Sequence, residues 1–110
     1  DLASLIDDVR FTTNTKTKNF IFDEFIKRNN GLDYQQFKND FEILSVLRNL
    51  KIIGIFARLA IRDKKNTYLK LIPYAWDLID LRISKNPIFK DLNYLLSKNF
   101  HKKIRKCYEN

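Results

Sequence analysis

The residues whose types and spacing best suit a functional site are four cations on one side of a predicted long helix. At roughly 100° per residue, Arg48, Lys51, Arg58 and Arg62 fall within a sector of about 80°. The apolar residues among them point in nearly every direction, which predicts a helix surrounded by other elements. A basic strip on such a helix favours an anionic ligand or a carboxylate partner. The alternative is a solvated face whose aliphatic stems lie along the helix.

The composition argues against several kinds of catalytic site. One Cys and one His cannot supply a zinc cluster, and two glycines cannot build a Gly-rich phosphate loop. His101 has no Ser or Cys nucleophile motif near it, and Cys107 has no second cysteine with which to form an internal disulfide. We therefore predict no catalytic residue and no metal-ligating residue in this chain.

The chain reads as part of a cytoplasmic protein. It has no apolar run of 18 residues and no signal-peptide pattern, so no membrane association is expected. It contains no Met and opens on Asp1, directly before an apolar periodic segment. We therefore expect a fragment whose N-terminal part is missing.

The charge is distributed unevenly between the two halves of the 110 residues. Residues 1–50 carry a net charge of −1 and residues 51–110 a net charge of +9, which gives the total of +8. The basic half supports a second hypothesis, a small helical module that binds nucleic acid or an acidic protein. No nucleic-acid motif accompanies it, so nucleic acid is not the expected partner. The residues that would carry this alternative are Lys98, Lys102, Lys103, Arg105, Lys106 and the nearby Tyr108.

Periodicity and capping signals predict an all-α fold, with five or six helices packed around one long central helix. Asp33 and Gln36 form a capping-box pair before the long helix, and Pro73 and Pro87 suit helix starts. The inward positions expected in the last helix include Ile88 and Leu95. The predicted helical segments are 2–9, 18–29, 34–62, 68–71, 73–84 and 87–99, and residues 101–110 form a basic tail.

Three stretches resemble bacterial kinases of the aminoglycoside phosphotransferase-like family. They read DLASL at 1–5, RNLKIIGIFARL at 48–59 and RDKKNTYLKLIP at 62–73. They look like the C-terminal helical part of these enzymes. The nearest resemblance is to the branch that phosphorylates the anomeric position of N-acetylmuramate and N-acetylglucosamine in cell-wall recycling. The segment 64–66, Lys-Lys-Asn, is more basic than the family's Gly-containing turn.

The resemblance implies that residues 1–100 form the C-terminal helical subdomain of a protein-kinase-like fold. The nucleotide lobe and catalytic loop would lie upstream, so the chain alone is expected to be inactive. The intact enzyme would use ATP and Mg²⁺ on an amino sugar acceptor. Asp1 would be a structural residue that buttresses the catalytic loop, or else a plain helix cap.

Four residues are the candidates for a role in that kinase: Arg48, Asn49, Lys51 and Arg58. They would contact the acceptor sugar or its phosphate, or they would brace the catalytic loop. Bracing is the preferred interpretation, because an arginine on a dry helical face is usually paired with a carboxylate.

Overall fold

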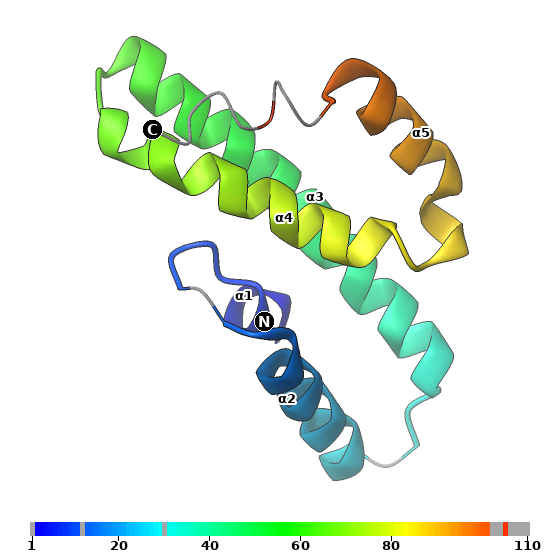
Figure 1. Ribbon diagram of the computed structural model, residues 1–110. Helices are drawn as coiled ribbons and strands as arrows, with labels where there is room; N and C mark the ends of the chain where they lie inside the picture. The colour runs from blue at the N-terminus through cyan, green and yellow to red at the C-terminus, as the bar shows by residue number, and fades with distance from the viewer. Residues whose placement is uncertain (1, 12, 30, 102–104, 106–110) are drawn as a thin grey trace.

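The computed structural model describes residues 2–11, 13–29, 31–101 and 105, and every regular element in these ranges is a helix or a 3₁₀ turn (Figure 1). The predicted all-α class is therefore confirmed. None of the described helices is long and apolar enough to cross a membrane. In chain order the elements are α1 (Leu2–Ile6), α2 (Thr15–Arg28), α3 (Tyr34–Arg62), η1 (Asn66–Leu71), α4 (Ile72–Ile83), η2 (Pro87–Phe89) and α5 (Lys90–Asn99).

The long helix α3 begins and ends as the sequence predicts. The Asp33 side chain caps it by accepting a 3.1 Å hydrogen bond from the Gln36 backbone N–H. The capping box is only half formed, because the Gln36 side chain donates instead to Asp40. Lys64 follows the last turn with a φ of +56°, and the next N–H, that of Lys65, bonds back to the Leu59 carbonyl. A lysine thus takes the left-handed position after the helix, which glycine usually occupies.

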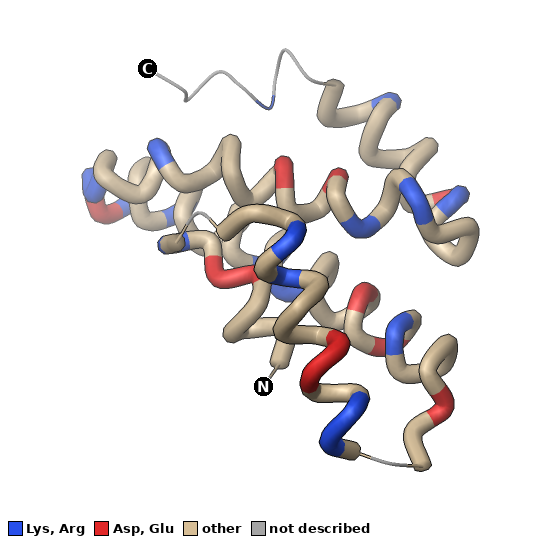
Figure 2. The backbone as a smooth tube through the Cα atoms, turned by 60° about the horizontal axis from the view of Figure 1, so that its bottom comes forward, with Lys and Arg blue, Asp and Glu red and all other residues tan. Residues whose placement is uncertain are grey.

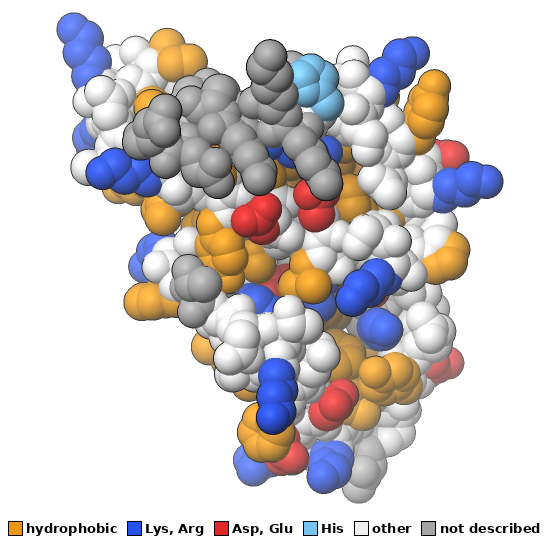
Figure 3. Space-filling model, viewed as in Figure 1, with side chains coloured by type: hydrophobic (Ala, Val, Ile, Leu, Met, Phe, Trp, Pro, Cys, Tyr) orange, Lys and Arg blue, Asp and Glu red, His pale blue; other side chains and the backbone are white. Residues whose placement is uncertain are grey.

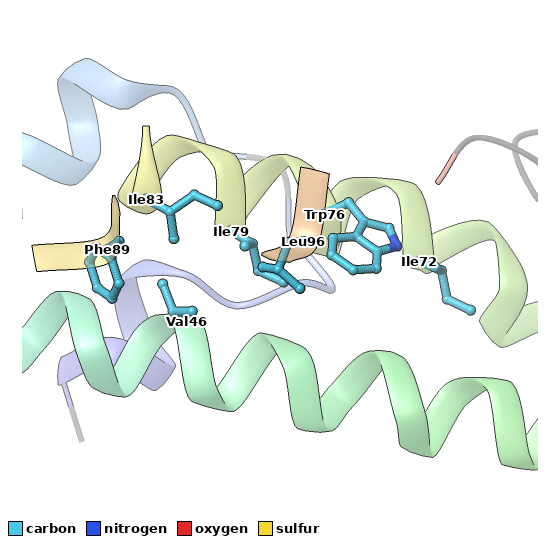
Figure 4. Close-up of a cluster of buried hydrophobic side chains, with 7 residues drawn as sticks. All are labelled: Val46, Ile72, Trp76, Ile79, Ile83, Phe89 and Leu96. Carbon is cyan, nitrogen blue, oxygen red and sulfur yellow. The ribbon is translucent and has the colours of Figure 1, made fainter. Parts of the chain in front are cut away.

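The main core lies between α3 and α4, which run side by side in opposite directions (Figure 1). Figure 4 shows the apolar side chains of α4 pointing toward α3, with Trp76 and Ile79 in the middle of the row. Helix α5 folds back onto the same cluster through Leu96. The 29 residues of α3 span roughly 43 Å at 1.5 Å each, which accounts for most of the 47 Å long axis of the molecule.

A second, aromatic-rich cluster joins α1 and α2 to the first half of α3. Ala3 and Ile6 from α1 meet Phe22 from α2 and Phe41 from α3. The Phe22 and Phe41 rings lie 5.1 Å apart, and further ring contacts extend the cluster to Phe37. Because aromatic side chains bury a large area, these few residues hold α2 against α3.

Several predicted boundaries were wrong by a few residues. The first helix ends at Ile6 and not at Val9, and α2 begins at Thr15, because the Asn14 side chain caps it. The predicted helix 87–99 is divided into the 3₁₀ turn η2 and the helix α5. The different twist of η2 changes which residues face inward. Phe89 is buried as a result, while the predicted inward residues Ile88 and Leu95 are about half exposed.

The expectation that α3 is surrounded on all sides was also wrong. Beyond residue 50, one side of the helix is open to solvent along Lys51, Gly54, Arg58 and Ile61. Ile61 is 79% exposed, whereas Ala60 beside it is buried. Helix α4 and η1 cover the opposite side only. The apolar residues of this stretch therefore include some that meet no other described element.

The same substitution, Ile→Ala, at one buried and one exposed position compares the packed core with the open side of α3. Ile79→Ala should destabilise the chain by about 2–5 kcal/mol, because it leaves a cavity where the side chain is 0% exposed. Ile61→Ala should change stability by less than about 0.5 kcal/mol. Urea unfolding of both variants gives the two free energies. Equal losses would contradict the assignment of the core to the α3–α4 interface.

Candidate functional site

A fully buried carboxylate, that of Asp7, lies just after the end of α1. Asp7 is 0% exposed and accepts four side-chain hydrogen bonds. Arg82 of α4 binds it with both Nε and Nη2, each at 2.9 Å. Lys18 of α2 donates from 3.0 Å, and Ser45 of α3 donates through its hydroxyl. One carboxylate thus connects α1 with three other helices. Figure 2 shows that acidic and basic positions lie close together along the backbone.

We call Asp7 and its partners Lys18, Ser45 and Arg82 the junction. Lys18 is the partner that connects α2 to it. Its side chain is only 3% exposed, and its ammonium also donates to the backbone carbonyl of Ile6 at 2.5 Å. Ile6 ends α1, so its carbonyl has no partner within that helix. A buried lysine is tolerated here because a carboxylate and a carbonyl together replace its water.

The surroundings of Asp7 favour its charged form. Burial by itself raises the pKa of a carboxyl group, but the hydrogen bonds and positive charge of Arg82, with further bonds from Ser45 and Lys18, outweigh that effect. The pKa of Asp7 therefore lies below its ordinary value of 3.8. The carboxylate stays ionised and holds both cations in place at neutral pH.

A polar cleft opens beside the junction, between α2, α3 and the end of α4. Two adjoining hollows of about 230 and 440 Å³ share Lys18, Asn19, Lys38, Glu42 and Arg82 in their walls. The aromatic rings of Phe22, Tyr34 and Phe41 line the smaller hollow, and Lys85, Asn86 and Gln35 line the larger one. Figure 3 shows Lys and Arg side chains on the face where α2 lies opposite the end of α4. Cations, amides and aromatic rings in one cleft suit a small polar ligand.

The four residues predicted for the site do not share one surface. Arg48, Lys51 and Arg58 are exposed on α3, and none has a salt bridge to another described residue. Asn49 is fully buried, donates to the Ser45 carbonyl and leaves its Oδ1 without a partner. The charge of Arg48 helps to lower the pKa of Asp8, after the larger effect of the hydrogen bonds from Arg10. The three cations remain candidates for contact with another part of a protein, and Asp1 lies outside the described residues.

A shallow groove adjoins the first of these cations. It has a volume of about 260 Å³ and is lined by Ala3, Leu44, Leu47, Arg48 and Lys51. Leu44 and Leu47 are each 56% exposed, so the surface formed by α1 and α3 is apolar and bordered by positive charge. We call this surface the α1–α3 groove.

The position of Arg105 argues against the alternative hypothesis of a basic binding module. This side chain is 6% exposed, binds Asp80 at 2.7 Å and lies over the ring of Trp76 at 4.5 Å. It therefore serves the core of the fold and is not part of a free basic surface. Lys98 lies near the ring of Tyr94. The other tail residues of that hypothesis, Lys102, Lys103, Lys106 and Tyr108, lie outside the described residues.

Sequence reasoning missed Asp7, Lys18 and Arg82, although a signal was present. Lys18 and Arg82 each occupy a position that periodicity assigns to the apolar side of a helix, whereas Asp7 does not. Lys18 is one turn before Phe22, and Arg82 lies between Ile79 and Ile83. A charge among apolar positions indicates a buried partner.

The buried carboxylate predicts a pH-dependent stability. Asp7→Asn should cost about 3–5 kcal/mol at neutral pH, because it leaves two buried cations without their counter-charge. Since the folded pKa is lowered, the contribution is present above the unfolded value of about 4 and is lost as pH falls through the folded pKa. Urea unfolding between pH 7 and acid should therefore show the two proteins converging.

The neighbouring Asp8 provides the matched control. It pairs with the exposed Arg10, so Asp8→Asn should change stability far less than Asp7→Asn at neutral pH. A constant difference between wild type and Asp7→Asn down to the lowest pH would contradict the assignment of the acid effect to Asp7.

Comparison with curated proteins shows a relationship to kinases. The N-acetylmuramate/N-acetylglucosamine kinase of Caulobacter vibrioides is 33% identical over 81 residues, which are 74% of this chain and 22% of the relative. The kinases of the same name from Pseudomonas aeruginosa and Pseudomonas putida are 33% and 34% identical, over 58% and 59% of the chain and 19% of each relative.

The predicted resemblance to this branch of kinases is therefore confirmed. The chain spans about a fifth of the length of the curated relatives that it matches. No protein-family model matches it, and no solved structure matches it.

Proposed function

We propose that this chain is the helical, acceptor-side portion of an ATP-dependent amino sugar kinase. The observation that carries the proposal is the 33% identity over 81 residues with a kinase named for N-acetylmuramate and N-acetylglucosamine. The matched length covers most of the chain, so the relationship concerns the helical unit as a whole and not one short motif. The all-α fold built on one long helix fits this portion of a kinase.

The remaining part of the kinase would supply the phosphoryl-transfer chemistry. ATP and Mg²⁺ are expected in the intact enzyme, where the metal ion bridges the phosphates. Among the described residues no three His, Cys, Asp or Glu side chains come together as a metal-ligand set. We therefore assign neither the metal ion nor a catalytic step to the described residues. Their role is to support and shape the acceptor side.

The α1–α3 groove is the proposed contact with that remaining part. The match covers 22% of the Caulobacter relative, so most of such a kinase has no counterpart in this chain. Leu44 and Leu47 offer exposed apolar area, and Arg48 and Lys51 at the border offer charge to a carboxylate. Exposed apolar groups bordered by polar ones are typical of an interface.

A chimeric kinase tests the proposal. The matched segment of the Caulobacter vibrioides kinase is replaced by the corresponding residues of this chain, and ATP-dependent phosphorylation of N-acetylmuramate and N-acetylglucosamine is measured. The chimera should be active, whereas the purified 110-residue chain should transfer no phosphate. A chimera that is folded by circular dichroism and thermal melting but is inactive on both sugars would argue against the proposal. So would activity of the chain alone.

The exposed cations of α3 have a separate test in the same chimera. Arg48→Ala and Arg58→Ala should each leave the stability of the isolated chain within about 0.5 kcal/mol, because neither side chain has a salt bridge to a described residue. If they brace the catalytic part, kcat should fall in the chimera; if they bind the acceptor, KM should rise. Lys70→Ala, another exposed cation, is the control. Unchanged kinetics in both arginine variants would remove their functional role.

A further inference from the structure

The cleft between α2, α3 and the end of α4 has a surplus of positive charge. Its walls contain Lys18, Lys38, Arg82 and Lys85, while Glu42 is the acidic residue common to both hollows. The exposed Asp23 lies at the smaller hollow, away from Lys85. Asp7 beneath the cleft accounts for one more negative charge and is already shared by Lys18 and Arg82.

The two lysines at the rim carry the unbalanced charge. Lys38 and Lys85 are exposed, and neither forms a salt bridge with another described residue. Glu42 does not neutralise them through such a contact; its Oε1 accepts a 2.9 Å hydrogen bond from Asn86. Asn86 in turn donates to Asn39, which fixes this edge of the cleft. An anion entering the larger hollow would therefore meet two cations that have no competing partner in the described part of the chain.

Arg82 is held so that one edge of its guanidinium remains available. Nε and Nη2 bind the carboxylate of Asp7, and the plane lies over the ring of Phe41 at 5.0 Å. Nη1 has no hydrogen-bond partner among the described residues. Since Asn49 Oδ1 is the one fully enclosed side-chain polar atom there that lacks a partner, Nη1 is not sealed inside the protein. Arg82 lines both hollows, and its Nη1 is the guanidinium nitrogen that Asp7 leaves for a ligand in the cleft.

The remaining wall suits the uncharged body of a small polar ligand. Asn19 and Asn86 provide amide groups, and Glu42 can accept from a hydroxyl or an amide. Tyr34 and Phe22 provide apolar ring surface at the inner hollow. The larger hollow, at about 440 Å³, lies within the range of small-molecule sites.

We propose that this cleft binds a carboxylate or phosphate group carried by a small, hydroxyl-rich ligand. Arg82, positioned by Asp7, donates to the oxyanion from the floor, and Lys38 and Lys85 approach it from the rim. In the setting of the proposed function, the ligand is an acidic amino sugar such as N-acetylmuramate, whose carboxylate distinguishes it from N-acetylglucosamine. Only this identification of the ligand body rests on the proposed function; the oxyanion site follows from the cleft.

Amide chemical shifts of the ¹⁵N-labelled 110-residue chain provide the test. It is titrated at constant ionic strength with three probes: N-acetylmuramate, N-acetylglucosamine and inorganic phosphate. N-acetylmuramate, phosphate or both should shift amides along the cleft, including those of Asn19 and Lys38, while N-acetylglucosamine shifts them at least about tenfold more weakly. If inorganic phosphate binds with the same affinity as N-acetylmuramate, the group recognised by the cleft is a phosphate. Preference for N-acetylmuramate identifies the sugar carboxylate.

Rim substitutions separate the site from general attraction to a basic protein. The double variant Lys38→Gln and Lys85→Gln should weaken oxyanion binding by about tenfold or more, since charge-assisted hydrogen bonds are lost. Both residues are exposed, so the melting temperature should be unchanged. Lys70→Gln, on η1 and outside the cleft, should bind as the wild type does.

Three results would overturn the proposal: no cleft shift with either anion, equal binding of N-acetylglucosamine, or unchanged binding in the double variant. The outcome is independent of the chimera experiment. An inactive chimera with intact oxyanion binding would contradict the kinase proposal and support the oxyanion site. An active chimera without oxyanion binding would support the kinase proposal and contradict the oxyanion site.

Discussion

The arrangement of the helices depends on the neutralisation of one buried carboxylate. Asp7 has no access to solvent, so its charge requires partners that are equally withdrawn from water. Lys18 and Arg82 meet this requirement from two different helices, and Ser45 adds a hydrogen bond from a third. Because the cations of α2 and α4 share the single carboxylate of Asp7, and Ser45 of α3 bonds to the same group, α1, α2, α3 and α4 have little freedom to change their relative positions.

The same junction forms the base of the polar cleft. Lys18 and Arg82 belong both to the buried ion cluster and to the cleft walls. Asp7 accepts one hydrogen bond from Lys18 and two from Arg82, and it thereby fixes the orientation of Arg82, which further rests on Phe41. A site built in this way gains rigidity from the core rather than from mobile surface side chains. The cations at its rim, Lys38 and Lys85, are instead exposed, so we expect that they can be changed without disturbing the fold.

Local signals in the sequence predicted the elements better than the site. Helix α3 was predicted from Tyr34 to Arg62 because an aspartate cap and a charged turn mark its ends, and these signals act within a few residues. The ion cluster joins residues 11 and 75 positions apart, and no local pattern specifies that pairing. The strip of cations on α3 was recognised correctly as one side of a helix. Its surroundings could not be predicted, because periodicity does not show which apolar sides other elements cover.

Native-state hydrogen exchange on Asp7→Asn tests most directly whether the carboxylate holds α2 in place. In the wild type, the amides within α2 should exchange slowly, as do those at the α3–α4 core around Val46 and Ile79. In the variant, protection should fall further in α2 than in α4. Both helices lose the counter-charge of a cation, Lys18 in α2 and Arg82 in α4, but α4 is still held against α3 by the apolar core. Unchanged protection of α2, or an equal loss in both helices, would contradict this account.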